Sequence, residues 1–267
     1  MPTPPISASP QETSSMSVSL TRLYAGPLKG MDRKLMTWDQ APETAWRAQD
    51  LFSRRGMAHV IQRYGAEHQH GDCRAVMSLW SKYFLALTTY TGVAHNLLAD
   101  RQLPLALPRL GVVLGEDMLI DALVVEETSS PLIDTRAEAR FLPLIRDTWG
   151  PAITCMAHHS GIAPRALWSN LGQYVDYLVR QLHALPEARS GAALGERWMT
   201  LRELADGQRN PLFQPVRHRE NAEGDIEPIR RVCCIRYLLP GLGYCGNCPL
   251  ACREKTEAQP PRRVANG

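Results

Sequence analysis

Five of the seven cysteines in this chain lie in one short stretch, VCCIRYLLPGLGYCGNCPLAC, between residues 232 and 252. Cys233 and Cys234 are adjacent, ten residues follow, and Cys245 and Cys248 then form a CxxC pair. Four thiolates this close in sequence are enough to ligate a [2Fe–2S] cluster or to complete a tetrahedral four-cysteine zinc site. The spacing therefore indicates a metal centre built from one local segment.

The residues between the two cysteine pairs favour iron–sulfur over zinc. Gly241, Gly243 and Gly246 lie there, and glycine lets backbone N–H groups come close to sulfur atoms. Hydrogen bonds of this kind tune the reduction potential of an iron–sulfur cluster. The adjacent pair also departs from zinc ribbons, which use two CxxC-like units. Because successive side chains of an extended segment point to opposite sides, Cys233 and Cys234 need a local distortion to bind one centre. On chemistry alone, both metals stay open.

The bulk composition is that of an ordinary globular protein, with 44% hydrophobic and 21% charged residues and a net charge of +3. That charge is too small to indicate a nucleic-acid binder. The N-terminal residues lack the pattern of a secretory signal. The apolar stretch 83–99 contains His95 and Asn96 and is expected to be a core helix, not a membrane span. We expect a cytoplasmic protein, in which clustered cysteines bind metal or do redox chemistry.

The sequence pattern outside the cysteine stretch predicts an α+β fold that is predominantly α-helical. A small β-hairpin is expected where LGVVL and MLIDALVV flank a turn at Gly115–Asp117. Asp72 is expected to cap a helix, Gly161 to end one, and Pro164 to lie in the first turn of the next. The expected helices are Glu43–Tyr64, a long one from Asp72, Leu132–Ser160 with bends at Pro143 and Gly150–Pro151, Arg165–Leu182, and Ala193–Ala205.

The chain is expected to divide into four parts. Residues 1–40 are a disordered or extended N-terminal tail and lead-in, and 41–206 form the mainly helical domain. Residues 207–252 form a compact C-terminal cysteine-ligated module, and 253–267 are a second tail. Within that module we expect a polar loop over 207–225 and a short strand, Ile229–Tyr237, that carries the first cysteine pair.

Two histidine-containing segments could bind metal, but a solvated loop and a helix end explain them better. His68, His70 and Cys73 fit no standard zinc spacing, so we expect a solvated loop. His158–His159 lies at a helix C-terminus, where imidazolium complements the helix dipole.

The remaining candidate residues have two interpretations each. Trp168, Tyr174 and Tyr177 lie on one predicted helix and are expected to pack in the core, although some of them could also line a ligand groove. Arg230, Arg231 and Arg236 form either a solvated basic rim or a surface that attracts an anionic ligand or a partner protein. Cys155 is expected to be a buried structural thiol and Cys252 a bystander that lies outside the four-cysteine pattern.

The stretch RRVCCIRYLLPGLGYCGNCPL closely resembles the C-terminal signature of FhuF-type ferric siderophore reductases. SLWSKYFLAL (Ser78–Leu87) and GIAPRALWSNLGQYVDYLV (Gly161–Val179) look similar to that family as well. The resemblance implies a [2Fe–2S] cluster held by four cysteines, in a cytoplasmic enzyme that reduces Fe(III) in imported siderophores. The implied ligands are Cys233, Cys234, Cys245 and Cys248.

The implied reaction is a one-electron reduction with no catalytic residue beyond the cluster; the residues that bind substrate are not identified. Hard oxygen ligands hold Fe(III) more tightly than Fe(II), so one electron makes the chelate, most simply a hydroxamate, labile. The chain has no G-x-G-x-x-G after a strand and no P-loop, so an external donor is expected: a ferredoxin, a flavin reductase or a small-molecule reductant. Neither nucleic acid nor a transmembrane segment is expected, and peripheral association with the inner membrane is compatible with siderophore import.

Two alternatives stay open. One is a non-enzymatic zinc module, held by the same four cysteines, that supports a protein interaction. The other is an iron–sulfur redox sensor.

Overall fold

The structure is a computed structural model that describes residues 20, 22–126, 129–220 and 224–251. It is mainly helical with small sheets, which confirms the predicted α+β class. The helices are α2 (Ala48–Leu51), α3 (Arg54–Ala66), α4 (Cys73–Thr88), α5 (Ala94–Ala99), α6 (Gly150–Ser160), α7 (Pro164–His183) and α8 (Arg189–Thr200). Short π-helices cover Thr89–Val93 and Leu144–Trp149, and 3-10 turns cover Asp32–Lys34, Pro186–Ala188 and Arg236–Leu238.

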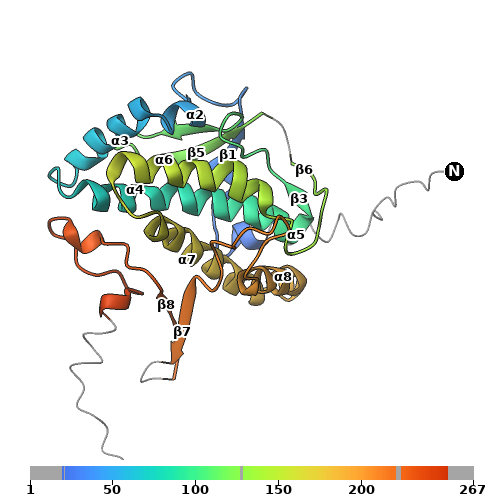
Figure 1. The fold of residues 1–267 in the computed structure, drawn as a ribbon. Coiled ribbons are helices and arrows are strands. Elements are labelled where there is room, and N and C mark those ends of the chain that lie inside the picture. Colours follow the sequence, from blue (N-terminus) through green and yellow to red (C-terminus); the bar gives the residue numbers. More distant parts are fainter. Residues whose placement is uncertain (1–19, 21, 127–128, 221–223, 252–267) are drawn as a thin grey trace, which may run out of the picture.

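The strands form three small sheets. They are β1 (Leu35–Thr37), β2 (Trp46–Arg47), β3 (Arg101–Gln102), β4 (Gly111–Leu114), β5 (Ile120–Val125), β6 (Ser130–Pro131), β7 (Val216–Glu220) and β8 (Ile226–Arg230). The largest sheet has the order β1-β5-β4-β2, in which β1 runs parallel to β5 and the other pairs are antiparallel. The β4–β5 pair is the predicted hairpin. β3 pairs with β6, and β7 with β8, whose ribbon projects from the helical body (Figure 1).

The core lies between the helices and the largest sheet. α4 packs against α3, α6 and α7, and its sheet-facing side meets β5. Trp80 of α4 is fully buried and donates from Nε1 to the carbonyl of Met118 at 2.8 Å. Leu23 and Leu28, from the segment expected to be a lead-in, are also buried in this core.

The prediction of a helix over Glu43–Tyr64 is wrong at the N-terminal end of that range. Trp46 pairs with β4 as part of β2, and the chain becomes helical only at Ala48. Ser53 then interrupts the helix, because its Oγ accepts from the N–H of Gly56 at 3.2 Å and donates to the carbonyl of Asp50 at 2.6 Å. A serine that satisfies backbone groups in this way ends one helix and caps the next.

The helix expected over Leu132–Ser160 is shorter than predicted. Residues 132–141 form no helix, so Pro143 lies in the first turn, where a proline is tolerated, and not at a bend. Pro151 has no N–H to donate to the carbonyl of Asp147, and the N–H of Leu107 donates to that carbonyl instead at 3.0 Å. The predicted disturbance near Gly150–Pro151 thus takes the form of the π-helix Leu144–Trp149.

Several local predictions are confirmed. Asp72 caps α4 by accepting from the N–H of Arg74 at 2.9 Å. Gly161 ends α6 in the left-handed conformation with φ of 75°, and Pro164 opens α7. The last predicted helix is displaced, since α8 ends at Thr200.

Two predictions in this region are wrong: the strand over Ile229–Tyr237 and the continuous loop over residues 207–225. β7 occupies part of that loop, and β8 ends at Arg230, before the cysteines. The ladder ends where Val216 pairs with Arg230, because the preceding residue, Pro215, has no N–H. The N–H of Arg230 donates to the carbonyl of Asn247 at 3.0 Å, so the chain turns into the cysteine segment there.

Candidate metal centre

The cysteine segment, residues 230–251, lies against α4 and α7 (Figure 1). Ser78 of α4 donates from Oγ to the carbonyl of Cys234 at 2.7 Å. Ser169 of α7 donates in the same way to the carbonyl of Val232 at 3.1 Å. Farther along α7, Gln173 Oε1 accepts from Asn247 Nδ2 at 3.0 Å. Polar side chains of α4 and α7 therefore hold the start of the segment, and Gln173 of α7 holds the part near Asn247.

The structure brings the four predicted cysteines together as two sulfur pairs. The Sγ atoms of Cys233 and Cys248 are 3.7 Å apart, and those of Cys234 and Cys245 are 3.8 Å apart. Within the described residues, no three Cys, His, Asp or Glu side chains surround one point as a single metal ion requires. Two thiolates on one tetrahedral metal lie about 3.8 Å apart when the metal–sulfur bond is about 2.3 Å. Two separate pairs at this spacing match a centre with two metal atoms.

A backbone distortion follows the adjacent cysteines, as their spacing requires. Ile235 has φ of 52°, in the left-handed region that a β-branched residue rarely adopts. The reversal directs its N–H to Cys233 Sγ at 3.3 Å. The backbone N–H of Arg236 likewise donates a hydrogen bond to the sulfur of Cys234. N–H···S bonds are therefore present as expected, but these two come from residues other than the glycines.

Two cations lie beside the Cys234–Cys245 pair. Lys82 of α4 places Nζ 3.6 Å from Cys234 Sγ. Arg230 is 1% exposed and donates from Nη2 to Asn170 Oδ1 on α7. The hydrogen bond between the two thiols lowers the pKa of Cys234, and the positive charges of Lys82 and Arg230 lower it further. The same hydrogen bond raises the pKa of Cys245, so Cys234 is the thiol that ionises first.

These residues fit an anionic iron–sulfur cluster. Within the described chain, Arg230 Nε and Nη1 are buried without a hydrogen-bond partner. A buried cation of this kind is costly unless negative charge lies nearby. Four cysteine thiolates holding a cluster would supply that charge beside Arg230.

The polar residues that hold the segment were missed in the sequence. Asn170 is fully buried, and its Nδ2 donates to the carbonyl of Ser78 at 2.9 Å and to Ser81 Oγ at 3.0 Å. The available signal was the presence of Ser78, Ser81 and Asn170 on otherwise apolar helix faces. Periodicity alone indicates that such positions belong to a helical core and does not show what they hydrogen-bond.

The other candidate residues have mixed outcomes. Arg230 does not belong to a solvated rim, since it is buried, whereas Arg231 is exposed and donates to Gln214 Oε1 at 2.7 Å. Trp168, Tyr174 and Tyr177 all pack against the hydrophobic core, as expected, and Tyr174 and Tyr177 also line cavities. Cys155 is half-buried, not fully buried.

The histidines take the expected places. His68 and His70 lie in the turn before α4 and His158–His159 in the last turn of α6. Cys252 lies outside the described residues.

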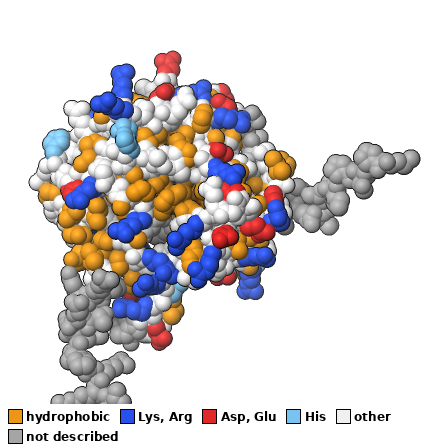
Figure 2. All heavy atoms as spheres, viewed as in Figure 1, with side chains coloured by type: hydrophobic (Ala, Val, Ile, Leu, Met, Phe, Trp, Pro, Cys, Tyr) orange, Lys and Arg blue, Asp and Glu red, His pale blue; other side chains and the backbone are white. Residues whose placement is uncertain are grey.

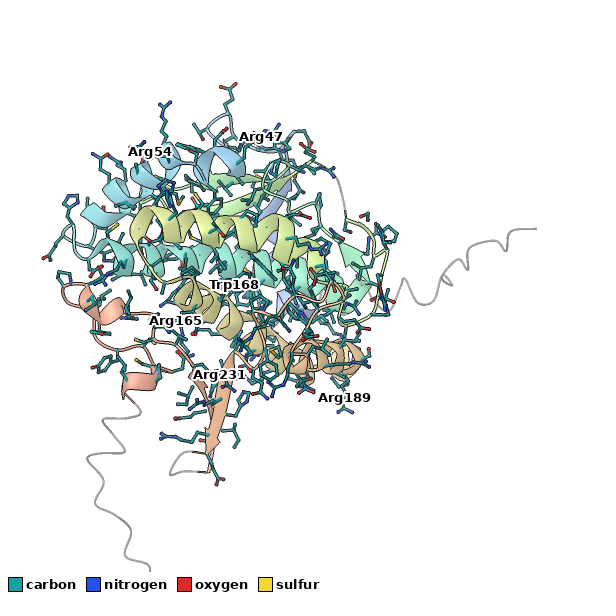
Figure 3. All side chains as sticks on the ribbon, viewed as in Figure 1. Arg47, Arg54, Arg165, Trp168, Arg189 and Arg231 are labelled. Atoms are coloured by element: carbon teal, nitrogen blue, oxygen red, sulfur yellow. The ribbon has the colours of Figure 1, made fainter. Side chains whose placement is uncertain are left out.

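Basic side chains are frequent on the face that carries α7 and the β7–β8 ribbon (Figure 2). Arg165 of α7 and Arg231, which follows β8, are both exposed there (Figure 3). None of the helices in the described residues is long and apolar enough to cross a membrane.

Comparison with known proteins gives two neighbouring family matches. Residues 78–226, more than half of the chain, match the family described as "Ferric iron reductase FhuF-like transporter". Residues 230–250 match "FhuF 2Fe-2S C-terminal domain". A curated relative, the ferric siderophore reductase of Escherichia coli (strain K12), is 27% identical over 111 residues, which cover 42% of this chain and 40% of that relative. The second match includes both cysteine pairs and confirms the predicted [2Fe–2S] cofactor.

Proposed function

We propose that this chain, which belongs to the FhuF-like ferric iron reductase family, reduces Fe(III) bound in a siderophore by one electron. The observation that carries the proposal is the pair of close sulfur contacts beside two buried or half-buried cations. The name of the curated relative supports the substrate class. A [2Fe–2S] cluster supplies reversible one-electron transfer when bound.

The cluster ligands in this proposal are Cys233, Cys234, Cys245 and Cys248. The two short Sγ distances support a division in which Cys233 and Cys248 bind one iron and Cys234 and Cys245 the other. Lys82 and Arg230 lie on the side of the second pair, where their charges favour the reduced and more negative state. Ser78 and Asn170 hold the peptide backbone and Arg230 in place.

The substrate is a ferric hydroxamate, whose hard oxygen atoms release iron once it is Fe(II). No bond of the siderophore is cut. The electron comes from an external donor in the cytoplasm, either a ferredoxin, a flavin reductase or a small reductant. The exposed arginines near the cysteine segment suit a donor with an acidic surface.

The first test is a measurement of iron, acid-labile sulfide and zinc per chain in anaerobically purified protein. We expect about two irons and two sulfides, as a [2Fe–2S] centre requires. Cys234→Ser should remove both, whereas Cys155→Ser should retain them because Cys155 lies on α6, away from the pairs. One zinc per chain without sulfide would establish the alternative of a zinc site with four cysteine ligands.

The second test follows the EPR signal of dithionite-reduced protein after mixing with ferric desferrioxamine B or a ferric tris-catecholate. We expect stoichiometric loss of the signal with release of Fe(II) to an Fe(II) chelator. A stable signal with every chelate would contradict reductase activity and leave the redox-sensor alternative.

A further inference from the structure

We propose that the ferric chelate binds in the groove between α4, the π-helix Thr89–Val93 and α7, beside Cys234. This inference rests on the proposed function and names the substrate site that the function requires. The groove has a volume of about 440 Å3. Its walls include Lys34, Lys82, Tyr83, Ala86, Tyr90 and Tyr174. Sites for small organic ligands typically measure about 300–1,000 Å3, and such walls combine apolar surface with a few polar groups.

The groove and the cysteine pairs share a wall. Lys82 lines the groove, and its Nζ lies 3.6 Å from Cys234 Sγ. Tyr174 also lines the groove and lies within electrostatic range of Arg230, Cys234 and Cys245. A chelate in this groove therefore lies directly across Lys82 and Tyr174 from the second sulfur pair.

Aromatic rings form the end of the groove nearest α7. The rings of Tyr90 and Tyr174 meet edge to face with centroids 5.8 Å apart. Tyr90 lies on the π-helix, and π-helical segments occur frequently at functional sites. These rings give the hydrocarbon arms of a hydroxamate chelate an apolar surface.

The charges of the groove match the iron-binding oxygens of such a chelate. Each hydroxamate presents negatively charged oxygen to the metal, and Lys34 and Lys82 bring two positive charges to the groove walls against the one carboxylate, Asp121. Fe(III) gains one electron and becomes Fe(II), the reduced protein loses that electron, and the external donor restores it. The product leaves as Fe(II) and an intact siderophore.

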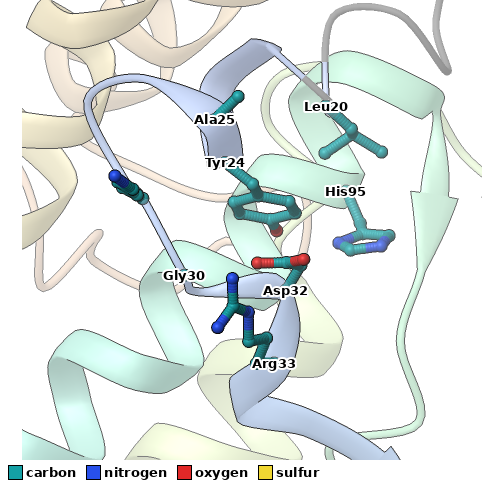
Figure 4. Close-up of a pocket in the computed structure, with 8 residues that line it drawn as sticks. Leu20, Tyr24, Ala25, Gly30, Asp32, Arg33 and His95 are labelled. Carbon is teal, nitrogen blue, oxygen red and sulfur yellow. The ribbon is translucent and has the colours of Figure 1, made fainter.

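A second cavity of about 480 Å3 is a poorer candidate (Figure 4). Its walls include Lys29, Asp32, Arg33 and His95, and within the described residues none of them contacts a cysteine sulfur, whereas Lys82 of the groove does. Each cavity is lined by two cations and one carboxylate, Asp32 here and Asp121 in the groove, so contact with the cysteine pairs and not charge favours the groove. Lys29 and Lys34 therefore distinguish the two cavities, since one lies in each.

The test measures binding without electron transfer. Gallium(III) N-acetyl-desferrioxamine B, whose capped terminal amine leaves the complex without net charge, is a redox-inert analogue of a ferric hydroxamate. Its affinity for the cluster-containing protein is obtained by isothermal titration calorimetry. Ala86→Leu, which fills the groove from α4, should raise the dissociation constant about tenfold, or by about 1.4 kcal/mol. Ala193→Leu, at an exposed position of α8, is the matched control and should bind as wild type. An unchanged visible spectrum shows that each variant retains its cluster and fold.

A charge pair provides the second variant set. Lys34→Glu should weaken gallium chelate binding, and Lys29→Glu should not. The groove is not the chelate site if wild type, Ala86→Leu and Lys34→Glu bind the gallium chelate equally well. The same conclusion follows if wild type does not bind it. If the groove variants weaken binding but no ferric chelate reoxidises the reduced protein, the proposed reduction fails and the groove stands.

Discussion

Within the described residues, the guanidinium group of Arg230 is buried with fewer hydrogen-bond partners than it has donors. Its side chain is buried, and in the described structure only Nη2 has a hydrogen-bond partner, on Asn170. Its positive charge acts on the sulfurs of Cys234 and Cys245 and favours the ionised form of each thiol. An arginine in this position stabilises negative charge on the cysteine pair, and reduction of the cluster increases that charge.

Arg230→Met is therefore expected to make the reduction potential more negative. A tenfold change in the reduction equilibrium corresponds to about 59 mV for a one-electron couple, and we expect a shift of this order. The measurement is a redox titration followed by EPR. Arg231→Met removes an exposed neighbouring charge and should leave the potential close to wild type, because solvent screens it. Equal potentials in the two variants, with full cluster content, would show that Arg230 has only a structural role.

The sequence predicted that four cysteines would come together, and the structure brings their sulfurs into two close pairs; their role as ligands stays a prediction, and the residues around them were not predicted. The cysteine spacing and its flanking residues indicated the family and the cofactor, and both are confirmed. Lys82 and Arg230 could not be placed, because their positions depend on how the segment docks on α4 and α7. Arg230 in particular lies next to exposed Arg231, and nothing in their sequence order shows which one is buried.

Among the elements, α7 does most to position the cysteine segment. Gly172 lies in α7 between Asn170 and Gln173, both of which bind that segment. A Cβ atom at Gly172 would lie 2.2 Å from Cβ of Pro215, the residue before β7. Glycine therefore allows the helix and the start of the ribbon to approach each other closely.

Gly172→Ala should destabilise the protein by about 1–3 kcal/mol, the usual cost of overpacking. Helix propensity alone predicts the opposite sign, a gain of about 1 kcal/mol. The clash should decide the outcome, because Pro215 is a ring on a constrained backbone. Thermal unfolding followed by far-UV circular dichroism measures the difference. Gly243→Ala is the control, since a Cβ there would have no atom within 4 Å. A variant at Gly172 that is as stable as wild type would refute this account.

The elements were predicted well where the signal was local. Asp72, Gly161 and Pro164 mark helix ends through their own chemistry, and the β4–β5 hairpin joins neighbouring strands. β1 and β2 were missed because each is only two or three residues long and pairs with a strand far along the chain. Periodicity cannot detect a strand that short, and the partner strands supply the pairing.

At the scale of the whole molecule, the cysteine segment depends on the helical body. Leu239 and Cys248 are buried, and Leu239 belongs to the same core cluster as α4 and α7. The carbonyl groups of Val232 and Cys234 accept from Ser169 and Ser78, which lie on those helices. The segment was expected to form a compact module, and these contacts show how closely it is joined to the larger part.

We therefore expect loss of the cluster and unfolding of the helices to occur in one transition. In an anaerobic urea titration, visible absorbance would report the cysteine segment and far-UV circular dichroism the helices. Small domains commonly unfold cooperatively, and a segment without a separate core shares the stability of the element it packs on. Asn170→Ala should shift both midpoints together to lower urea, because it removes the partner of Arg230 and the amide that joins α7 to Ser78. Loss of absorbance well before the helical signal would instead assign residues 207–252 to an independently unfolding unit.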